Sequence, residues 1–111
     1  MNEKPSVRIQ LDYLQGPIWI SDAATGEPMT GIETVDHDPV LRELNHRAAQ
    51  LFASYYDFDT QGVPCWFDHE KEKAEKEIML ELIGCIVQRL QEINDGSFTV
   101  EDLETERLRS L

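Results

Sequence analysis

The sequence lacks most of the features that assign a chain to a well-marked class of protein. It has only two cysteines, Cys65 and Cys85, without a CxxC spacing, so neither a disulfide framework nor a zinc site is expected. Cys85 falls within an apolar helical pattern and is interpreted as a small buried hydrophobe. No apolar run approaches the ~18 residues of a membrane span, and the opening MNEKPSVRIQ lacks the apolar segment of a secretion signal. We therefore expect a cytoplasmic protein that does not enter a membrane.

Basic residues are also scarce. Only 10 Lys and Arg stand against 22 Asp and Glu, which gives a formal net charge of −12 at pH 7. This charge repels nucleic-acid phosphates and anionic lipid headgroups, so direct binding to nucleic acid or to a membrane surface is disfavoured. A basic protein partner is favoured instead, although such acidity can also serve solubility alone. Because the charge opposes self-association, we expect a monomer or a weak dimer.

Catalytic and metal-binding motifs are missing as well. His37 and His69 stand beside carboxylates in the runs DHD and DHE, but no spacing matches HExxH, an EF-hand loop or a cysteine pair. Both histidines lie at expected helix starts, where acidic residues are common because they favour the helix dipole. No carboxylate pair has an apolar setting that indicates a shifted pKa. The sequence predicts no enzyme, no metal and no cofactor.

The chain is long enough for one domain, residues 1–111, with one modest core. Its organising stretch, Asp68 to Gly96, predicts one long amphipathic helix. Asp68 suits the N-cap, and Gly96 suits the residue just past the C-terminus. The first two turns, His69 to Glu77, have almost no apolar side chain and are expected to project beyond the core. The apolar stripe recurs at steps of three and four: Ile78, Met79, Leu82, Ile83, Ile86, Leu90 and Ile93.

The clearest strand patterns lie in the first third of the chain. Apolar and polar residues alternate from Val7 to Tyr13, which predicts a strand with one buried face. Ile18 to Ile20 follows a Gly-Pro pair and is expected to form a hairpin with that strand. Ile32 to Val35 is a candidate third strand. Between Ser21 and Gly31 the composition indicates a loop.

Helical signals begin at Asp38, which suits an N-cap, with Pro39 at the first helical position. This helix is expected to end near Tyr56 or Asp57, and Asp57 to Phe67 is interpreted as a loop. The segment after Ser97 is ambiguous, because Thr99-Val100-Glu101-Asp102 resembles a capping box but Phe98 and Val100 alternate as in an edge strand. We favour a short strand ending near Val100, followed by a short helix.

These elements predict an α+β fold. A small N-terminal antiparallel sheet of two or three strands packs on two antiparallel helices, with a short C-terminal strand or helix.

Aromatic residues and acids coincide between Tyr55 and Glu70, a stretch without lysine or arginine. Residues 36–70 also carry seven acids against two bases, the largest excess in any part of the chain. Tyr and Trp supply contact area at low entropic cost, and neighbouring carboxylates can pair with a partner's basic residues. Packing in the core is the alternative explanation for each aromatic residue alone. The candidate binding residues are Tyr56, Asp57, Phe58, Asp59, Trp66, Asp68 and Glu70.

Two runs, GPIWISDAATGEPMTGIETV (Gly16 to Val35) and EINDGSFTVEDLE (Glu92 to Glu104), resemble the immunity proteins of bacterial contact-dependent growth inhibition systems. This resemblance implies a specific, tight, non-catalytic inhibitor of a cognate toxin domain, commonly a nuclease acting on tRNA or DNA. It supplies no functional residues for this chain.

Two other function classes stay open. A small acidic adaptor or regulatory protein would have an apolar binding face and would self-associate. A metal-dependent hydrolase would need His37 or His69 to converge with two carboxylates.

Overall fold

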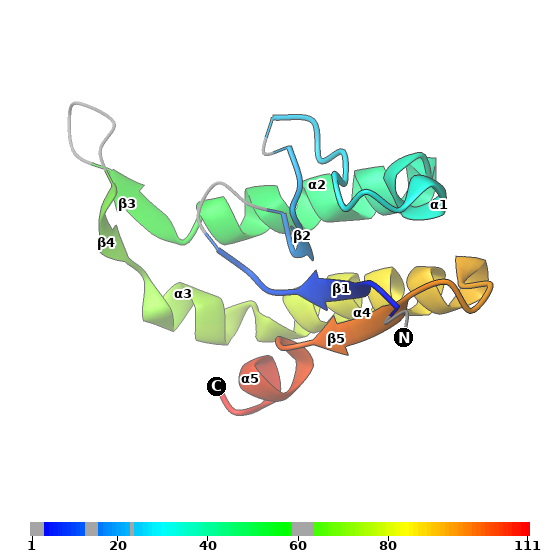
Figure 1. Ribbon diagram of the computed structural model, residues 1–111. Coiled ribbons are helices and arrows are strands. Elements are labelled where there is room, and N and C mark those ends of the chain that lie inside the picture. Colours follow the sequence, from blue (N-terminus) through cyan, green and yellow to red (C-terminus); the bar gives the residue numbers. More distant parts are fainter. Residues whose placement is uncertain (1–3, 13–15, 23, 59–63) are drawn as a thin grey trace.

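The computed structural model describes residues 4–12, 16–22, 24–58 and 64–111, with the side chains at 57, 58, 64 and 65 left out of the description. As the sequence predicts, the fold is α+β (Figure 1). Its elements, in chain order, are β1 (Ser6–Ile9), β2 (Ile18–Trp19), α1 (Glu33–Asp36), α2 (Pro39–Ala53), β3 (Tyr56–Phe58), β4 (Pro64–Phe67), α3 (His69–Ala74), α4 (Lys76–Ile93), β5 (Thr99–Asp102) and α5 (Thr105–Arg109).

The main sheet has the strand order β2-β1-β5. β1 and β2 pair antiparallel, with Ile9 opposite Ile18, which confirms the predicted hairpin. β5 pairs parallel to β1, with Val7 opposite Val100. The sheet is therefore mixed, and the expectation of a wholly antiparallel N-terminal sheet was wrong, because its third strand comes from the other end of the chain.

The candidate strand from Ile32 to Val35 was also wrong, since this segment contains the short helix α1. The Asp36 carboxylate accepts hydrogen bonds from the backbone N–H groups of Thr30 and Gly31, at 2.8 Å each. These bonds fold the chain back on itself in a tight turn. Val35 lies in α1, and its side chain is buried there although the segment is not a strand.

Two long helices, α2 and α4, lie side by side and run antiparallel, as predicted (Figure 1). Asp38 caps α2, with its side chain accepting from the N–H of Leu41, and Pro39 occupies the first turn. The predicted helix over Asp68 to Asn94 is interrupted once. Glu75 adopts φ −103° and ψ 12°, outside helical geometry, and this separates α3 from α4.

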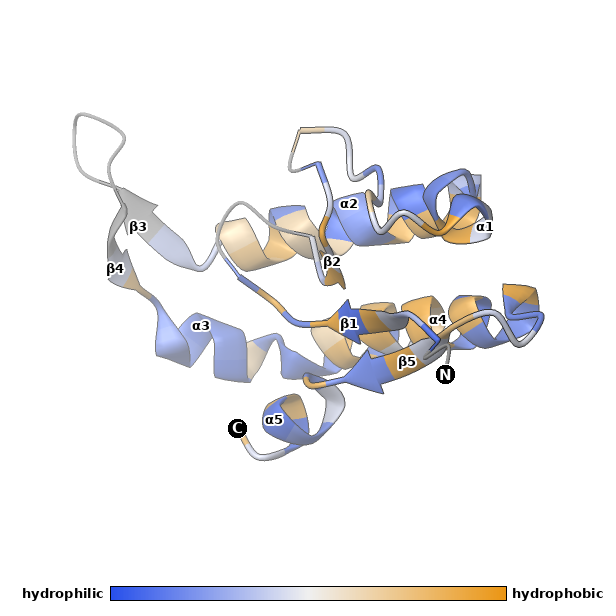
Figure 2. Cartoon of the chain, viewed as in Figure 1, coloured by the Kyte–Doolittle hydropathy of each residue, from blue (hydrophilic) through white to orange (hydrophobic). Residues whose placement is uncertain are grey.

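The two ends of this helical stretch agree with the prediction. Asp68 caps α3 by accepting from the Lys71 N–H at 3.0 Å. α4 ends at Ile93, and Gly96 follows with φ +96°, a conformation in which a residue with a Cβ would be strained. The first turns were expected to project beyond the core, and α3 is indeed largely hydrophilic (Figure 2) and contributes no residue to the buried apolar cluster. Its Glu72 is nevertheless buried.

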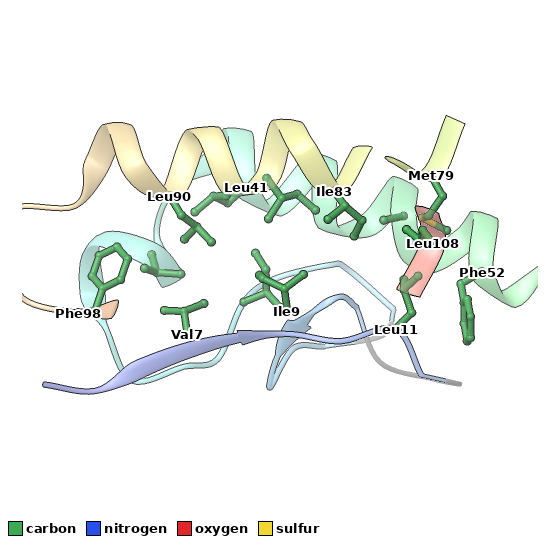
Figure 3. Close-up of a cluster of buried hydrophobic side chains, with 14 of the residues drawn as sticks. Val7, Ile9, Leu11, Leu41, Phe52, Met79, Ile83, Leu90, Phe98 and Leu108 are labelled. Carbon is green, nitrogen blue, oxygen red and sulfur yellow. The ribbon is translucent and has the colours of Figure 1, made fainter. Parts of the chain in front are cut away.

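The core lies between the sheet and the helix pair (Figure 3). Val7, Ile9 and Leu11 on and just after β1 point toward Met79, Ile83 and Leu90 of α4, with Leu41 and Phe52 contributed by α2. Burial of these side chains is the main stabilising term of the fold. At about 1.5–3 kcal/mol for each fully buried large aliphatic side chain, this cluster outweighs any single polar contact described below.

The apolar stripe of α4 is only partly buried. Its buried members are Met79, Ile83, Ile86 and Leu90, whereas Ile78 is 54% exposed. Cys85 is exposed too, so its interpretation as a buried hydrophobe was wrong. It lies on the face of α4 that the sheet does not cover. No helix within the described residues is long and apolar enough to cross a membrane.

The segment predicted as a loop, Asp57 to Phe67, instead contributes to a two-stranded antiparallel hairpin, β3–β4. Tyr56 pairs with Phe67, and Asp57 pairs with Trp66. The aromatic and β-branched composition that suggested a binding loop also favours strands. Figure 1 shows this hairpin beyond the ends of α2 and α3, at the far end of the molecule from α1.

Candidate functional site

The β3–β4 hairpin carries most of the residues that the sequence proposes for binding. Tyr56 and Phe58 delimit β3, Trp66 lies in β4, and Asp68 and Glu70 follow at the start of α3. The pairing of the two strands brings Tyr56 and Trp66 to the same end of the molecule, although ten positions separate them in sequence. Asp59 lies outside the described residues, as do the side chains of Asp57 and Phe58.

Three rings fix the hairpin to the end of α2. Phe67 lies 5.5 Å from Phe52 and 5.0 Å from Tyr56, measured between ring centroids, and Tyr56 lies 5.8 Å from Phe52. The edge-to-face and tilted arrangements are those that aromatic quadrupoles favour. Phe67 also contacts the His69 ring at 4.8 Å. Part of the predicted aromatic patch is therefore core, and Tyr55, which is fully buried, belongs to that part.

Trp66 differs from these rings because its side chain is 64% exposed. An open pocket of about 260 Å³ adjoins it, lined by Ser54, Tyr55, Tyr56, Trp66, Asp68 and Lys71. Removing an indole from water is worth several kcal/mol, so an exposed Trp on a projecting hairpin is a ready anchor for a partner.

The two described acids of the patch have different roles. Asp68 is half-buried, and its carboxylate is already engaged as the N-cap of α3. Glu70 is exposed in the first turn of the same helix. Glu70 therefore has its carboxylate available to a partner, whereas Asp68 contributes mainly through its charge.

A second group of charged residues, which no pattern in the sequence indicates, lies next to the hairpin. Arg107 of α5 binds two buried carboxylates. Its Nη2 donates to Glu72 Oε2 at 2.9 Å, and its Nε donates to Glu104 Oε1 at 2.7 Å. The side chains of Glu72 and Glu104 are 2% and 4% exposed. Because 35 positions separate Glu72 from Arg107, no local sequence pattern could reveal this pairing.

A pocket of about 400 Å³ opens beside this cluster. Its lining includes the rings of Phe52, Tyr56, Phe67 and His69 together with charged groups and residues that follow β1. Tyr56 lines this pocket as well as the smaller one next to Trp66, so the two pockets are neighbours. The remaining lining residues are Gln10, Leu11, Asp12, Glu72, Glu104, Arg107 and Leu111.

Burial shifts the acid–base properties of this end of the molecule. It raises the pKa of Glu104, against the hydrogen bond from Arg107, which acts in the opposite direction. Burial, together with the negative charges of Glu75 and Glu72, raises the pKa of Tyr55 to about 12. The Tyr55 hydroxyl and Glu75 Oε2 are buried without a hydrogen-bond partner among the described residues. Such perturbed groups concentrate at functional sites more often than elsewhere.

The opposite end of the molecule also has a buried carboxylate. Arg89 of α4 holds Asp38 in a two-bond fork, with Nε–Oδ2 at 2.9 Å and Nη2–Oδ1 at 2.8 Å. These hydrogen bonds lower the pKa of Asp38. Nearby, a shallow apolar groove between α2 and α4 is lined by Val40, Leu44, Cys85, Gln88, Arg89 and Glu92.

No three His, Cys, Asp or Glu side chains come together as a metal-ligating group in the part of the chain that the structure describes. The convergence of His37 or His69 with two carboxylates, which a metal-dependent hydrolase would need, is not found there. His69 instead packs edge-on against Phe67.

Comparison with protein families, with curated proteins and with solved structures gives no match for this chain.

Proposed function

We propose that this protein is an immunity-type inhibitor, which binds a basic toxin domain, most plausibly a nuclease, and neutralises it. The observation that carries the proposal is the exposed Trp66 on a hairpin at one end of a chain of net charge −12. An indole that is 64% exposed has no role in the core of its own protein. Placed beside acids, it has the composition of an interface hot spot for a basic partner.

Other predicted residues lie at the same end of the molecule. Tyr56 provides a half-buried ring whose packing against Phe52 and Phe67 holds it in place before a partner arrives. Such preorganisation lowers the entropic cost of association. Glu70 is exposed next to it, and Asp57 and Asp59 add negative charge in sequence.

The mechanism of inhibition would be electrostatic mimicry. A nuclease cleft is lined by basic residues that hold phosphates, and a carboxylate surface can occupy these groups in place of the nucleic acid. The negative charge of the whole chain would steer the two proteins together, so the association rate should be high at low ionic strength and should fall as salt is added.

The proposal is tested by co-expression. A toxin domain encoded beside the gene of this protein, once identified, would be produced in a susceptible cell with and without it, and survival would be scored. Protection, together with a salt-sensitive complex of the two purified proteins, is the expected result. If cells die equally in both cases and the purified proteins do not associate, the inhibitor proposal is wrong.

The adaptor alternative has one observation in its favour. Val40 is 45% exposed at the groove between α2 and α4, far from the hairpin, and Ile78 is 54% exposed on α4. An adaptor that used this apolar face would self-associate. Sedimentation of the purified protein over a hundredfold range of concentration distinguishes the two proposals, because the inhibitor is expected to stay monomeric or weakly dimeric.

A further inference from the structure

The pocket of about 400 Å³ beside the hairpin has an unusual combination of walls. Its lining combines the aromatic rings of Phe52, Tyr56 and Phe67 with the carboxylates of Glu72 and Glu104. A purely apolar pocket would not place two carboxylates in its lining.

The charge of the lining determines which ligands it can accept. Glu72 and Glu104 contribute two buried carboxylates, against the single guanidinium of Arg107, and the exposed residue Asp12 also lines the pocket. When ionised, Glu72, Glu104 and Arg107 together leave an excess of one negative charge. Nearby Glu75 adds to the negative field, as its effect on Tyr55 indicates. Anions are therefore disfavoured, even though the Arg107 side chain is 40% exposed.

The aromatic side of the pocket narrows the choice further. Cations are attracted to the faces of aromatic rings, and a planar guanidinium can also stack on them. The rings of Phe67 and Tyr56 are held 5.0 Å apart and are fixed against Phe52, so this wall exists before a ligand enters. Aliphatic carbons of a long basic side chain can pack on the same rings while its head reaches the carboxylates.

We propose that this pocket binds an arginine side chain of the basic partner. The inference rests on the proposed function and deepens it, because it assigns a second recognition element in a pocket that shares Tyr56 with the pocket next to Trp66. In the complex, Trp66 would bury its indole against the partner's surface. The partner's arginine would enter between the rings and the Glu72–Glu104–Arg107 cluster.

The test needs no toxin. Full-length protein, labelled with ¹⁵N, is titrated with N-acetyl-arginine amide and, in parallel, with N-acetyl-citrulline amide, which has nearly the same shape but no charge. Saturable shifts are expected for the arginine probe at pocket residues such as Phe67 and Glu104, with a Kd on the order of millimolar for so small a ligand. The citrulline probe should produce much weaker shifts.

Variants assign the shifts to the pocket. Asp12→Asn, at the exposed rim, should weaken the arginine probe roughly two- to fivefold without affecting the fold. Glu104→Gln should weaken it at least as much, and its spectrum reports directly whether Arg107 keeps its place. Glu92→Gln removes an equal charge at the far end of the molecule and should change nothing.

Three results would overturn the proposal. Equal shifts from citrulline would mean that charge is not recognised. Shifts spread over the whole acidic surface, and unaffected by Asp12→Asn and Glu104→Gln, would mean non-specific attraction. Shifts produced by inorganic phosphate instead of arginine would mean that Arg107 dominates the pocket. Each of these results leaves the inhibitor proposal standing if co-expression still protects, so the two failures are distinguishable.

Discussion

Each end of the molecule has an arginine that binds buried carboxylate. The pKa of a buried carboxyl group is shifted down at one end and up at the other. At one end Asp38 meets Arg89 in a closed two-bond fork, caps α2, and has its pKa lowered. At the other end two carboxylates share Arg107 beside an open pocket, and burial raises the pKa of Glu104. Both arginines line an opening, so the two ends differ in the number of buried carboxylates for each arginine. One buried carboxylate matches one guanidinium at Arg89, whereas the excess of buried carboxylate at Arg107 is a feature found at functional sites more often than elsewhere.

The largest effect should come from the core that joins the two ends. Ile86 is fully buried in the middle of α4, so Ile86→Asp would bury an unpaired charge and should unfold the protein. Gln88→Asp adds the same charge on the exposed face of the same helix and should change stability by only a few tenths of a kcal/mol. Circular dichroism of both variants checks this, and a folded Ile86→Asp protein would contradict the arrangement of α4 against the sheet.

At the hairpin end, Arg107→Met should leave two buried carboxylates without their partner. The expected loss is on the order of 3–5 kcal/mol of unfolding free energy at neutral pH. Arg109→Met is the matched control, since Arg109 pairs with Glu106 on the exposed face and should contribute less than about 0.5 kcal/mol. Urea unfolding measures both values. If both variants lost the same unfolding free energy, the charges of Glu72 and Glu104 would not depend on Arg107 for their stabilisation.

At the opposite end, Asp38→Asn should cost less. Asparagine still caps α2, so the change removes the ionic part of the fork with the partly exposed Arg89 and should cost about 1–2 kcal/mol. Glu92→Gln removes the exposed partner of the same arginine and should cost a few tenths of a kcal/mol. A larger loss of unfolding free energy from Asp38→Asn than from Arg107→Met, in the same urea experiment, would contradict the expected order of the two effects.

Lowering the pH should change the contributions of Asp38 and Glu104 to stability in opposite directions. The pKa of Asp38 is lowered in the fold, so its contribution is present above the ordinary value of 3.8 and is lost as the pH falls through the folded pKa. The pKa of Glu104 is raised, so its ionisation opposes folding above the ordinary value of 4.5, and acidification removes that penalty.

Relative to Glu104→Gln, the wild-type protein should therefore gain stability as the pH is lowered toward 4.5. Relative to Asp38→Asn, it should lose stability below 3.8. Unfolding free energies of the three proteins at matched ionic strength, from pH 7 to pH 3, check both signs. If the unfolding free energies of all three proteins changed with pH in the same way, the opposite pKa shifts of Asp38 and Glu104 would be contradicted.

The fold was predictable where local chemistry decides it. The alternation of Val7 and Ile9 gave a strand, and Asp38 and Asp68 cap the helices that they were expected to cap. The third strand was not predictable, because β5 joins the sheet only through its parallel pairing with β1 from the far end of the chain. No periodicity within one segment contains that information.

The candidate site was predictable in part for the same reason. Clustering of aromatic residues and acids in sequence indicated the surface that now contains Trp66 and Glu70. The sequence does not reveal that α3 and α5 lie together in the fold. Glu72, Glu104 and Arg107 were therefore not predicted as a cluster. Glu72 in particular lies in the turns from His69 to Glu77 that were expected to project beyond the core, and only its burial separates it from its neighbours.

The central claim is that the hairpin end binds a basic toxin domain, and one binding titration tests it most directly. The double variant Trp66→Ala/Glu70→Gln would be compared with Val40→Ala/Glu92→Gln, which makes matched changes at the other end of the molecule. The account predicts that the first loses about 2–5 kcal/mol of binding free energy, mainly through faster dissociation, and that the second binds as the wild type does. Undiminished binding by the hairpin variant, or a loss confined to the Val40 variant, would contradict it.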